Sequence, residues 1–378
     1  MAHLGGTADS TQEIHLTFRL QGHLRERSML EDNSTDFLPL LHDHMVHYCQ
    51  NTSATYDTLL DHNLRFWRKI GLDGLYDHTS RSAEILYVVN NTIYMERGAT
   101  RGGLLPSYFS LLKSLSLKMV LPDLALPFNS GDKPSQPVNQ SQGGKHTPVL
   151  SFCTTPAHSD ILFPSVLEGD VSKCYEVPKY ATHRLHRAVW RGTADPFDGW
   201  RKGMSAFLQL GLEHPELIDS GVSMWSSELM NQTLPDKRFL KESLSFEEQV
   251  AMYRYLIWTP GNCASGRLAS QLASDAAVFK VESDESEWYY PLLKPFVHYI
   301  PLEANSTHVN LADMMYWARH HQSEVDAIVS EANKLARLYL SVTGRDCYNA
   351  TRSKTARNEF VKCSGAPLSR QCHQLQTA

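Results

Sequence analysis

The chain has 378 residues, 42% of them hydrophobic, and a formal net charge of −5 at pH 7. This length and apolar content are enough for one large or two ordinary domains with buried cores, which argues against a disordered chain. The basic residues are scattered instead of forming a stripe, so we expect no nucleic-acid partner. No window of about 18 apolar residues predicts a membrane span, and the N-terminus is too polar for a signal peptide. Membrane association is therefore expected only through a segment preceding this sequence.

Two features nevertheless favour the secretory lumen. The seven cysteines show no C-x-x-C pair and no metal-ligand spacing, so we expect no zinc, and their odd number leaves at least one thiol unpaired or linked between chains. A cytosolic protein with buried free cysteines is the alternative. N-x-S/T glycosylation acceptors, of which chance would give roughly two, occur at Asn33, Asn51, Asn90, Asn139, Asn231, Asn305 and Asn349.

The first half of the chain predicts an arm followed by mixed elements. Residues 1–55 are polar and irregular, as in an N-terminal arm. From Glu84, two β-rich runs separated by Asn-Asn predict a hairpin. Residues 104–115 have helical spacing, and the following KMVLPDL, residues 118–124, is strand-like. The Gly-, Pro- and Ser-rich residues 129–148 predict an exposed loop.

In the second half, strands and helices alternate. Apolar runs at 149–153 and 160–166 and a Pro-broken helical stretch at 173–187 lead to the strand AVWRGT, residues 188–193. Alternation of this kind predicts a parallel sheet covered on both faces. Residues 310–340 predict a long helix packed across the body. Between the strand at 188–193 and this long helix, we expect helices at 198–211, 245–254, 264–274 and 286–294, and strands at 255–260, 276–281 and 297–302.

The stretch GNCASGR, residues 261–267, joins one of these strands to the next helix. Ligands of doubly wound sheets sit outside the carboxyl ends of the strands, where the next helix begins with free N–H groups. Gly261 lets a ligand approach the backbone, Ser265 offers a hydroxyl, and Arg267 can hold a phosphate bidentately. The turn predicts a diphosphate site that needs no metal. The alternative is an ordinary helix start with a solvent-facing arginine.

A second arginine-bearing turn follows the strand at 188–190. Arg191, Gly192 and Thr193, with Arg201 on the next helix, repeat the same pattern. Two such turns in one half-sheet can converge on one anion, so we expect the guanidinium groups of Arg191 and Arg267 to meet at a common pocket. The alternative for Arg191 is an ion pair with a nearby carboxylate.

An aromatic and acidic stretch, ESEWYYPLLKPFVHYIPL, begins at residue 285. Glu287 lies near a strand end, where a carboxylate can accept hydrogen bonds from both ribose hydroxyls of a nucleotide. The alternative is an acidic residue favoured by the dipole of a helix start. Its neighbours Trp288, Tyr289 and Tyr290 are expected in the core.

This ordered set of motifs resembles glycosyltransferase family 90, the capsule-associated and Rumi-type protein O-glucosyltransferase and xylosyltransferase group. The matching features are an arginine-glycine-Ser/Thr turn, a K/R-Y strand, a G-x-x-x-S-x-R helix start and the block E-x-x-Y-P-x-L-K-P-x-V-H-Y-x-P. The likeness covers residues 151–340 well and residues 84–127 loosely. It implies an α/β, GT-B-like fold: two Rossmann-like domains facing a cleft, with a long C-terminal helical segment.

The resemblance further implies domain bounds and an activity. An arm at 1–55, an acceptor-side domain at 56–170, a nucleotide-sugar domain at 171–309 and C-terminal helices with a tail at 310–378 are expected. The expected reaction moves glucose or xylose, with inversion favoured, from a UDP-sugar to a hydroxyl of a protein or glycan, without a metal or other cofactor. We expect a monomer in the lumen of the endoplasmic reticulum or Golgi. The implied donor-binding residues are Arg191, Gly192, Thr193, Arg201, Gly261, Ser265, Arg267 and Glu287.

The catalytic base is assigned by the same resemblance. The family places an aspartate just beyond an N-domain strand, in a setting like φ-N-φ-x-D-x-P, where φ is apolar and the aspartate deprotonates the acceptor hydroxyl. In KMVLPDLALP this position falls on Asp123, although Leu121 and Pro122 replace the Asn-containing approach. Asp160 and Asp132 are lesser candidates, and a turn-forming role is the alternative for Asp123.

Similar proteins also tie a cysteine after the long C-terminal helix to the N-terminal region. This resemblance predicts a disulfide between Cys347 and Cys49, which would anchor the arm. Because the surroundings of Asp123 depart from the family pattern, a non-catalytic member that binds a nucleotide sugar or glycan is the alternative function. A hydrolase or a Rossmann dehydrogenase is disfavoured, since the sequence lacks G-x-S-x-G, H-E-x-x-H and G-x-G-x-x-G.

Overall fold

The computed structural model describes residues 49, 52, 54–66, 84–95, 104–121, 123–139, 148–164, 171, 184–194, 204–225, 237–303 and 309–349. The chain forms two compact units, Met1–Asn51 and Thr52–Ala378. Apart from Cys49, all the described residues belong to the second unit. The three expected domain boundaries inside residues 52–378 stay predictions.

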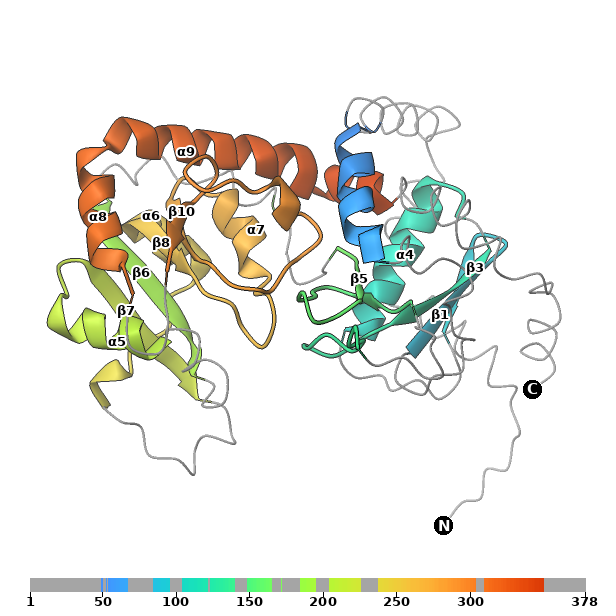
Figure 1. Cartoon of the computed structure of the whole chain (residues 1–378), viewed down its shortest axis with the longest axis horizontal. Helices are drawn as coiled ribbons and strands as arrows, with labels where there is room; N and C mark the ends of the chain where they lie inside the picture. Colours follow the sequence, from blue (N-terminus) through green and yellow to red (C-terminus); the bar gives the residue numbers. More distant parts are fainter. Residues whose placement is uncertain are drawn as a thin grey trace, which may run out of the picture. The chain divides into compact units, whose positions relative to one another are not determined.

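The first sheet of this unit has the strand order β2-β1-β3-β4-β5 (Figure 1). The strands are β1 (Glu84–Val89), β2 (Thr92–Met95), β3 (Leu124–Phe128), β4 (Leu150–Ser151) and β5 (Ile161–Leu162). The β1–β2 hairpin confirms the expected one: its turn residues Asn90 and Asn91 have φ angles of 48° and 60°. Two successive left-handed residues define the turn that matches the twist of a two-residue hairpin, and Asn tolerates this backbone well.

Helix α4 (Leu105–Lys118) packs against the first sheet. Its apolar residues recur at helical spacing, so Leu105, Tyr108, Leu112 and Leu115 are all buried. Tyr108 stacks on Phe128 of β3 with ring centroids 4.7 Å apart. This apolar face holds the helix on the sheet.

The second sheet is entirely parallel, with the order β10-β9-β8-β6-β7. Its strands are β6 (Leu185–Ala194), β7 (Ile218–Trp225), β8 (Tyr253–Trp258), β9 (Ala277–Val281) and β10 (Ile300–Leu302). Buried β-branched and aromatic residues on both faces of the central strands explain why helices cover this sheet on both sides. The expected α/β class with a parallel, doubly covered sheet is confirmed.

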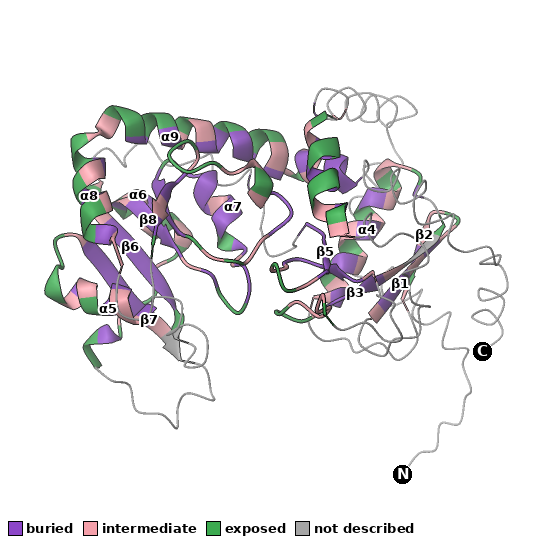
Figure 2. Ribbon diagram, viewed as in Figure 1, coloured by how far each residue is buried: buried purple, intermediate pink, exposed green. Residues whose placement is uncertain are grey.

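Helices cover the second sheet on opposite faces, as the buried residues of β6 show. Ala188 and Trp190 pack into a cluster with α5 (Met204–Glu213), α8 (Leu311–His320) and α9 (Gln322–Leu335). Val189, between them, faces the other way and packs with α6 (Phe246–Met252). Figure 2 shows the buried strands of this sheet in purple between helices with exposed outer sides.

Several expected elements have different bounds in the structure. Lys118 ends α4 and the next strand begins only at Leu124, so the strand expected at 118–124 is wrong. Residues 185–187 belong to β6, not to a helix. The helix expected at 286–294 is only a short 3₁₀ turn, Tyr290–Leu292, because Pro291 and the following Pro295 prevent a longer helix.

Two further differences concern the middle and the end of the chain. Strand β7 was not expected at all, since Ser and Gly interrupt its apolar pattern. The long helix at 310–340 is divided: α8 ends at His320, α9 begins at Gln322, and α9 continues into a π-helical turn at Ala336–Leu340. Residues 342–349 form one more helical segment.

One glycosylation acceptor is inaccessible in the folded chain. Asn90 and Asn139 are exposed, but Asn349 is only 2% exposed. A buried side chain cannot receive a glycan without unfolding locally, so the N-x-S/T pattern at 349 is not a usable acceptor in this fold. The acceptors at 33, 51, 231 and 305 lie outside the described residues.

Candidate functional site

The turn after β8 adopts a compact form at the carboxyl end of the parallel sheet. Trp258, the last residue of β8, donates from Nε1 to the carbonyl oxygen of Ser265 at 2.9 Å, and the Gly261 amide donates to the carbonyl of Cys263 at 2.8 Å. Helix α7 (Arg267–Leu272) follows at once. A Cβ on Gly261 would meet nothing closer than 3.9 Å, so the protein's own packing does not require glycine there.

Arg267 extends from this turn toward β6. It is an exposed residue, and its Nη1 donates to the main-chain carbonyl of Arg191 at 2.8 Å. Although part of the side chain reaches solvent, the surrounding protein atoms desolvate the Arg267 guanidinium and lower its pKa. The guanidinium remains positively charged at any physiological pH, so a cation lies at the carboxyl edge of the sheet.

The guanidinium of Arg191 has other partners. Arg191 is 7% exposed, and its side chain donates to Asp219 Oδ2 at 3.0 Å and to the carbonyl oxygens of Asp219, Trp190 and Glu242. With four of its N–H bonds engaged within the protein, Arg191 is held in an internal ion pair. The two guanidinium groups were expected to meet at a common pocket, and this expectation is corrected. Arg267 contacts the backbone carbonyl of Arg191, while the Arg191 side chain faces Asp219.

Asp219 on the unexpected strand β7 is the centre of this buried network. Besides Arg191, it accepts hydrogen bonds from Lys241 Nζ at 2.6 Å and from the hydroxyl of Tyr253. Burial alone would raise the pKa of Asp219, but the hydrogen bonds from these three groups outweigh it and lower the pKa far below its ordinary value. Asp219 was not predicted as a partner of Arg191 because strand β7, which contains it, was not predicted.

Gly192 has a structural reason for its place after Arg191. A Cβ at this position would lie 2.7 Å from Cζ2 of the Trp190 indole, closer than packing allows. Trp190 in turn donates from Nε1 to the hydroxyl of Thr259 at 3.2 Å, which links the end of β6 to the turn after β8. Thr193 is exposed, and Arg201 lies outside the described residues.

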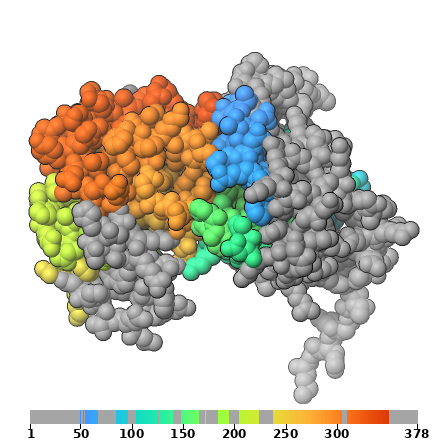
Figure 3. All heavy atoms as spheres, in the orientation of Figure 1, coloured from blue at the N-terminus to red at the C-terminus, as the bar shows by residue number. Residues whose placement is uncertain are grey.

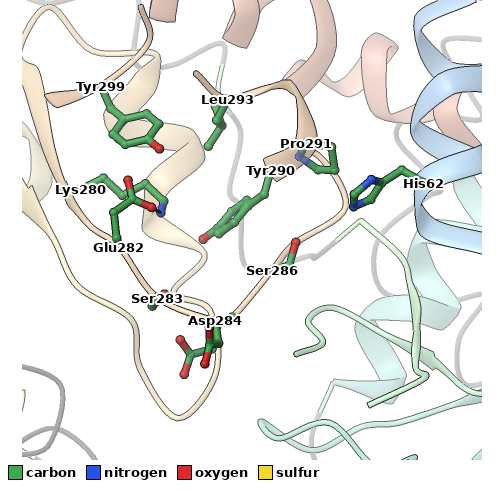
Figure 4. Close-up of a pocket in the computed structure, with 11 residues that line it drawn as sticks. His62, Lys280, Glu282, Ser283, Asp284, Ser286, Tyr290, Pro291, Leu293 and Tyr299 are labelled. Atoms are coloured by element: carbon green, nitrogen blue, oxygen red, sulfur yellow. Dashed lines mark ion pairs between the residues drawn. The ribbon is translucent and has the colours of Figure 1, made fainter. Parts of the chain in front are cut away.

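The segment after β9 borders a pocket of about 270 Å³ (Figure 4). Lys280, at 4% exposure, points between the rings of Tyr290, Tyr299 and Trp258, 5.1 to 5.3 Å from their centres. Burial lowers the pKa of Lys280, and Glu282, 3.6 Å from its Nζ, partly opposes this. Glu282, Asp284 and Glu285 make the rim acidic, so the rim favours hydroxyl or cationic groups over phosphate.

Glu287 is enclosed by the protein. It is 0% exposed, and the Tyr290 hydroxyl donates to its Oε1 at 3.4 Å. Trp288 and Tyr289 beside it are equally buried, as expected for core residues. The role of Glu287 toward a ribose stays a prediction, and in this structure its carboxylate does not reach the surface.

Of the three candidate aspartates, Asp123 lies at the beginning of β3. Its Oδ1 accepts a hydrogen bond from the Asn90 amide at 2.7 Å, in the turn of the β1–β2 hairpin. Asp123 therefore precedes the strand instead of following it. The turn-forming role that sequence analysis left open is the one for which the structure provides a contact.

Asp160 is a buried anchor. It is 4% exposed and accepts hydrogen bonds from the amides of Ser135 and Gln136 and from the hydroxyls of Ser135 and Ser151. These bonds attach residues 135–136 to β4. Residues 135–136 belong to the segment 129–148, which was expected as an exposed loop, and are thus fixed to the sheet. Residues 140–147 lie outside the described residues.

Asp132 lies on the surface just beyond the end of β3. The loop before it is shaped by Asn129, whose side chain accepts from the Gly131 amide at 3.0 Å and donates to the Lys133 carbonyl at 2.6 Å. Because β3 ends at Phe128, the sequence FNSGDKP places Asn129, Asp132 and Pro134 at the spacing of φ-N-φ-x-D-x-P, with Ser130 at the second apolar position. This spacing was the signal that sequence analysis overlooked.

Asp132 also adjoins the arginine-bearing turn. The Asn262 side-chain amide lies 3.5 Å from Asp132 Oδ2, and a disulfide between Cys153 and Cys263 joins the segment after β4 to the same turn. Figure 3 shows residues 150–163, in green, against the orange segment that follows β9. An exposed carboxylate thus lies in a loop that approaches the turn with an exposed guanidinium, and the disulfide joins a segment beside that loop to the same turn.

Cys49 and Cys347 are also disulfide-bonded, and their pairing with each other stays a prediction. Among the described residues, no group of three or more His, Cys, Asp and Glu side chains is arranged to hold a metal ion. Within the same part of the chain, no helix has the length and apolar character needed to cross a membrane.

The parallel α/β sheet thus has a cationic turn at its carboxyl edge, next to a surface aspartate from the first sheet, at the strand ends where proteins of this architecture bind their ligands. The model of glycosyl transferase family 90 matches residues 49–351. The chain therefore belongs to glycosyltransferase family 90.

Curated relatives include three O-glucosyltransferases. Protein O-glucosyltransferase 2 of Danio rerio is 27% identical over 274 residues, covering 69% of this chain and 52% of the relative. Protein O-glucosyltransferase 3 of Homo sapiens is 26% identical over 252 residues, covering 63% and 47%. The O-glucosyltransferase rumi homolog of Aedes aegypti is 27% identical over 246 residues and covers 60% of each chain. The matches thus span about half the length of the first two relatives.

The chain is also similar to two solved structures. Anabaena HepE, determined in complex with UDP-glucose, has a TM-score of 0.35 and 13% identity, covering 55% of this chain and 57% of HepE. The C-terminal domain of a glycosyl transferase group 1 family protein from Francisella tularensis has a TM-score of 0.33 and 9% identity, covering 46% and 98%.

Proposed function

We propose that this protein transfers a sugar, glucose or xylose, from a UDP-sugar to a hydroxyl of a protein or glycan, without a metal ion. The observation that carries the proposal is the proximity of Asp132 to the turn that bears Arg267, in a chain of glycosyltransferase family 90. The names of the relatives support a protein acceptor and glucose. For this chain, the protein acceptor and the transfer of glucose are parts of the proposal.

In the proposed reaction Arg267 stabilises the leaving group. The bond between the sugar's anomeric carbon and the diphosphate oxygen breaks, and the departing UDP gains negative charge. A fixed guanidinium lowers the energy of that state more than it lowers that of the bound donor. Ser265 and the Gly261 backbone border the same position. Arg191 acts indirectly, because its carbonyl holds the Arg267 side chain in place.

Asp132 is the proposed base. It takes the proton of the acceptor hydroxyl while the hydroxyl oxygen forms the new bond to the anomeric carbon. Asp132 is exposed, as a base that meets a large acceptor must be, whereas Asp160 is buried and Asp123 is bonded to a turn. Two features favoured a non-catalytic member, the poor fit around Asp123 and the unusual insertion at 129–148. The spacing around Asp132 supports the catalytic proposal against the first of them.

A matched pair of aspartate variants tests the proposal. We expect Asp132→Asn to lower the kcat for sugar transfer by about 10²- to 10⁴-fold, the typical contribution of a general base, with the Kd for UDP unchanged. Asp123→Asn is the control and keeps its kcat. The measurement is UDP release and acceptor mass across a panel of UDP-sugars, with and without EDTA.

Each outcome of this experiment is decisive. Full turnover by Asp132→Asn would remove Asp132 as the base, and loss of turnover in Asp123→Asn alone would restore Asp123. Tight UDP binding by the wild type with no turnover on any donor would favour the non-catalytic alternative. A rate abolished by EDTA would contradict metal independence.

The disulfides support a location in the secretory lumen as part of the proposal. Cys153 and Cys263 are bonded to each other, and Cys49 and Cys347 are disulfide-bonded as well. Such bonds persist in oxidising compartments and are rare in the cytosol. The expected monomeric state and the compartment, endoplasmic reticulum or Golgi, belong to the same proposal.

A further inference from the structure

We propose that the Cys153–Cys263 disulfide is a positioning device for sugar transfer, which holds the loop of the base against the turn that binds the leaving group. The inference rests on the proposed function. It assigns a kinetic role to two cysteines that no motif identified, and it predicts that the disulfide contributes to kcat and not to donor affinity.

The disulfide joins the turn that carries Arg267 to a segment that lies beside the loop of Asp132. Cys153 follows β4 of the first sheet, and Cys263 lies in the turn between β8 and α7 of the second, with Cα atoms 6.4 Å apart and 110 residues between them in sequence. Cys263 is next to Asn262, and the Cys153 sulfur lies 3.9 Å from the carbonyl oxygen of Asp132. The covalent link therefore passes directly beside the base.

The link is protected from solvent. Cys153 and Cys263 are 0% and 1% exposed, and they pack in a small apolar cluster with Phe152 and Ala264. A buried disulfide is shielded from exchange with soluble thiols, because exchange requires access for the attacking thiolate. The geometry thus points to a permanent restraint and not to a redox switch.

Non-covalent contacts also cross this junction among the described residues. Thr154, the residue after Cys153, exchanges two backbone hydrogen bonds with Ser286, of 3.0 and 2.9 Å. Asn262 and Asp132, both exposed, approach at 3.5 Å. Each hydrogen bond adds only about 0.5–1.5 kcal/mol in competition with water. Without the disulfide, non-covalent contacts of this kind would have to hold Asp132 near the turn.

That distance matters for transfer and much less for donor binding. The base has to reach the acceptor hydroxyl while the sugar is held by the turn, and a misplacement of about 1 Å can lower a rate by about 10²-fold. UDP contacts the turn itself, which Trp258 holds through Ser265 independently of Cys153. A loosened junction should therefore lower kcat and leave the Kd for UDP nearly unchanged.

The test is the double variant Cys153→Ala/Cys263→Ala, studied under non-reducing conditions well below its melting temperature. We expect kcat for transfer to fall by about 10- to 100-fold, with the Kd for UDP within about twofold of wild type. Backbone amides at 130–133 should exchange with solvent faster. The control is Cys49→Ser/Cys347→Ser, which removes two other disulfide-bonded cysteines and leaves Cys153 and Cys263 in place.

The control variant should keep its kcat when it is assayed equally far below its own melting temperature. An unchanged kcat in the folded Ala variant would overturn the proposal, as would an equal loss in both variants, since that would indicate general destabilisation. Loss of UDP affinity together with kcat would show that the disulfide builds the donor turn instead of positioning the base, and would also overturn it.

Hydrogen exchange separates this inference from the proposed function. If the wild type transfers no sugar from any UDP-sugar, the proposed function fails. Faster amide exchange at 130–133 in the Ala variant, with the rest of the chain unchanged, would still support the restraint. Exchange at 130–133 equal to that of the wild type would overturn it in every case.

Discussion

At the residue scale, Arg191 and Arg267 show how two similar motifs acquire different roles. Both arginines follow a strand in a glycine-containing turn, and sequence analysis gave them the same task. Arg191 is buried against Asp219, whereas Arg267 is exposed at the sheet edge. The difference depends on β7, whose carboxylate meets Arg191 only when strands distant in sequence become neighbours.

Replacing Asp219 tests the buried network. Asp219→Asn leaves Arg191 and Lys241 without their counter-ion, and loss of one partner from a buried pair typically costs about 3–5 kcal/mol. We expect the free energy of unfolding, measured with urea at pH 7, to fall by that amount. The exposed Asp57→Asn is the control and should change it by less than about 0.5 kcal/mol.

The same network predicts a pH dependence. Since the folded-state pKa of Asp219 is lowered, its stabilising effect is complete above the unfolded-state pKa of about 3.9 and is lost as the pH falls toward the folded-state pKa. The stability difference between wild type and Asp219→Asn should therefore shrink below about pH 4. The pKa of Tyr253, raised to about 12 by burial and by its bond to Asp219, plays no part in this range. A difference that grows on acidification would contradict the assignment.

At the scale of elements, local signals were most successful where short-range chemistry decides the structure. The hairpin at 84–95 was predictable because Asn-Asn tolerates the two left-handed residues of its turn. Helix α4 was predictable from its apolar spacing. The end of α4 was not, since Met119 and Val120 continue an apolar run that is equally compatible with a strand.

Helix α6 offers a direct test of an element boundary. Ser245 and Glu248 form a capping box: the Ser245 side chain accepts from the Glu248 amide at 3.1 Å, and the Glu248 carboxylate accepts from the Ser245 amide at 2.7 Å. We expect Ser245→Ala to lower the free energy of unfolding by about 1 kcal/mol. Ser243→Ala, at an exposed position outside the helix, is the control. Equal effects in urea unfolding would rule out the capping role.

At the scale of the whole molecule, the long-range disulfide should dominate stability. Cross-linking residues 110 apart removes chain entropy from the unfolded state that amounts to about 4.7 kcal/mol for a loop of roughly this length. We expect Cys153→Ala/Cys263→Ala to lower the free energy of unfolding by about 2–5 kcal/mol in non-reducing urea titrations. An unchanged midpoint would mean that the unfolded chain is already restricted in other ways.

The sequence alone determined the α/β class, the parallel sheet with helices on both faces, and the likeness to glycosyltransferase family 90. These follow from periodicity and from motifs contained within a few residues. Tertiary structure decided that Arg191 pairs with Asp219, that Asp160 is an internal anchor, that Asn349 is buried, and that Asp132 and not Asp123 adjoins the turn of Arg267. Each of these depends on strand ends and on contacts between distant segments, for which a linear pattern carries no distance information.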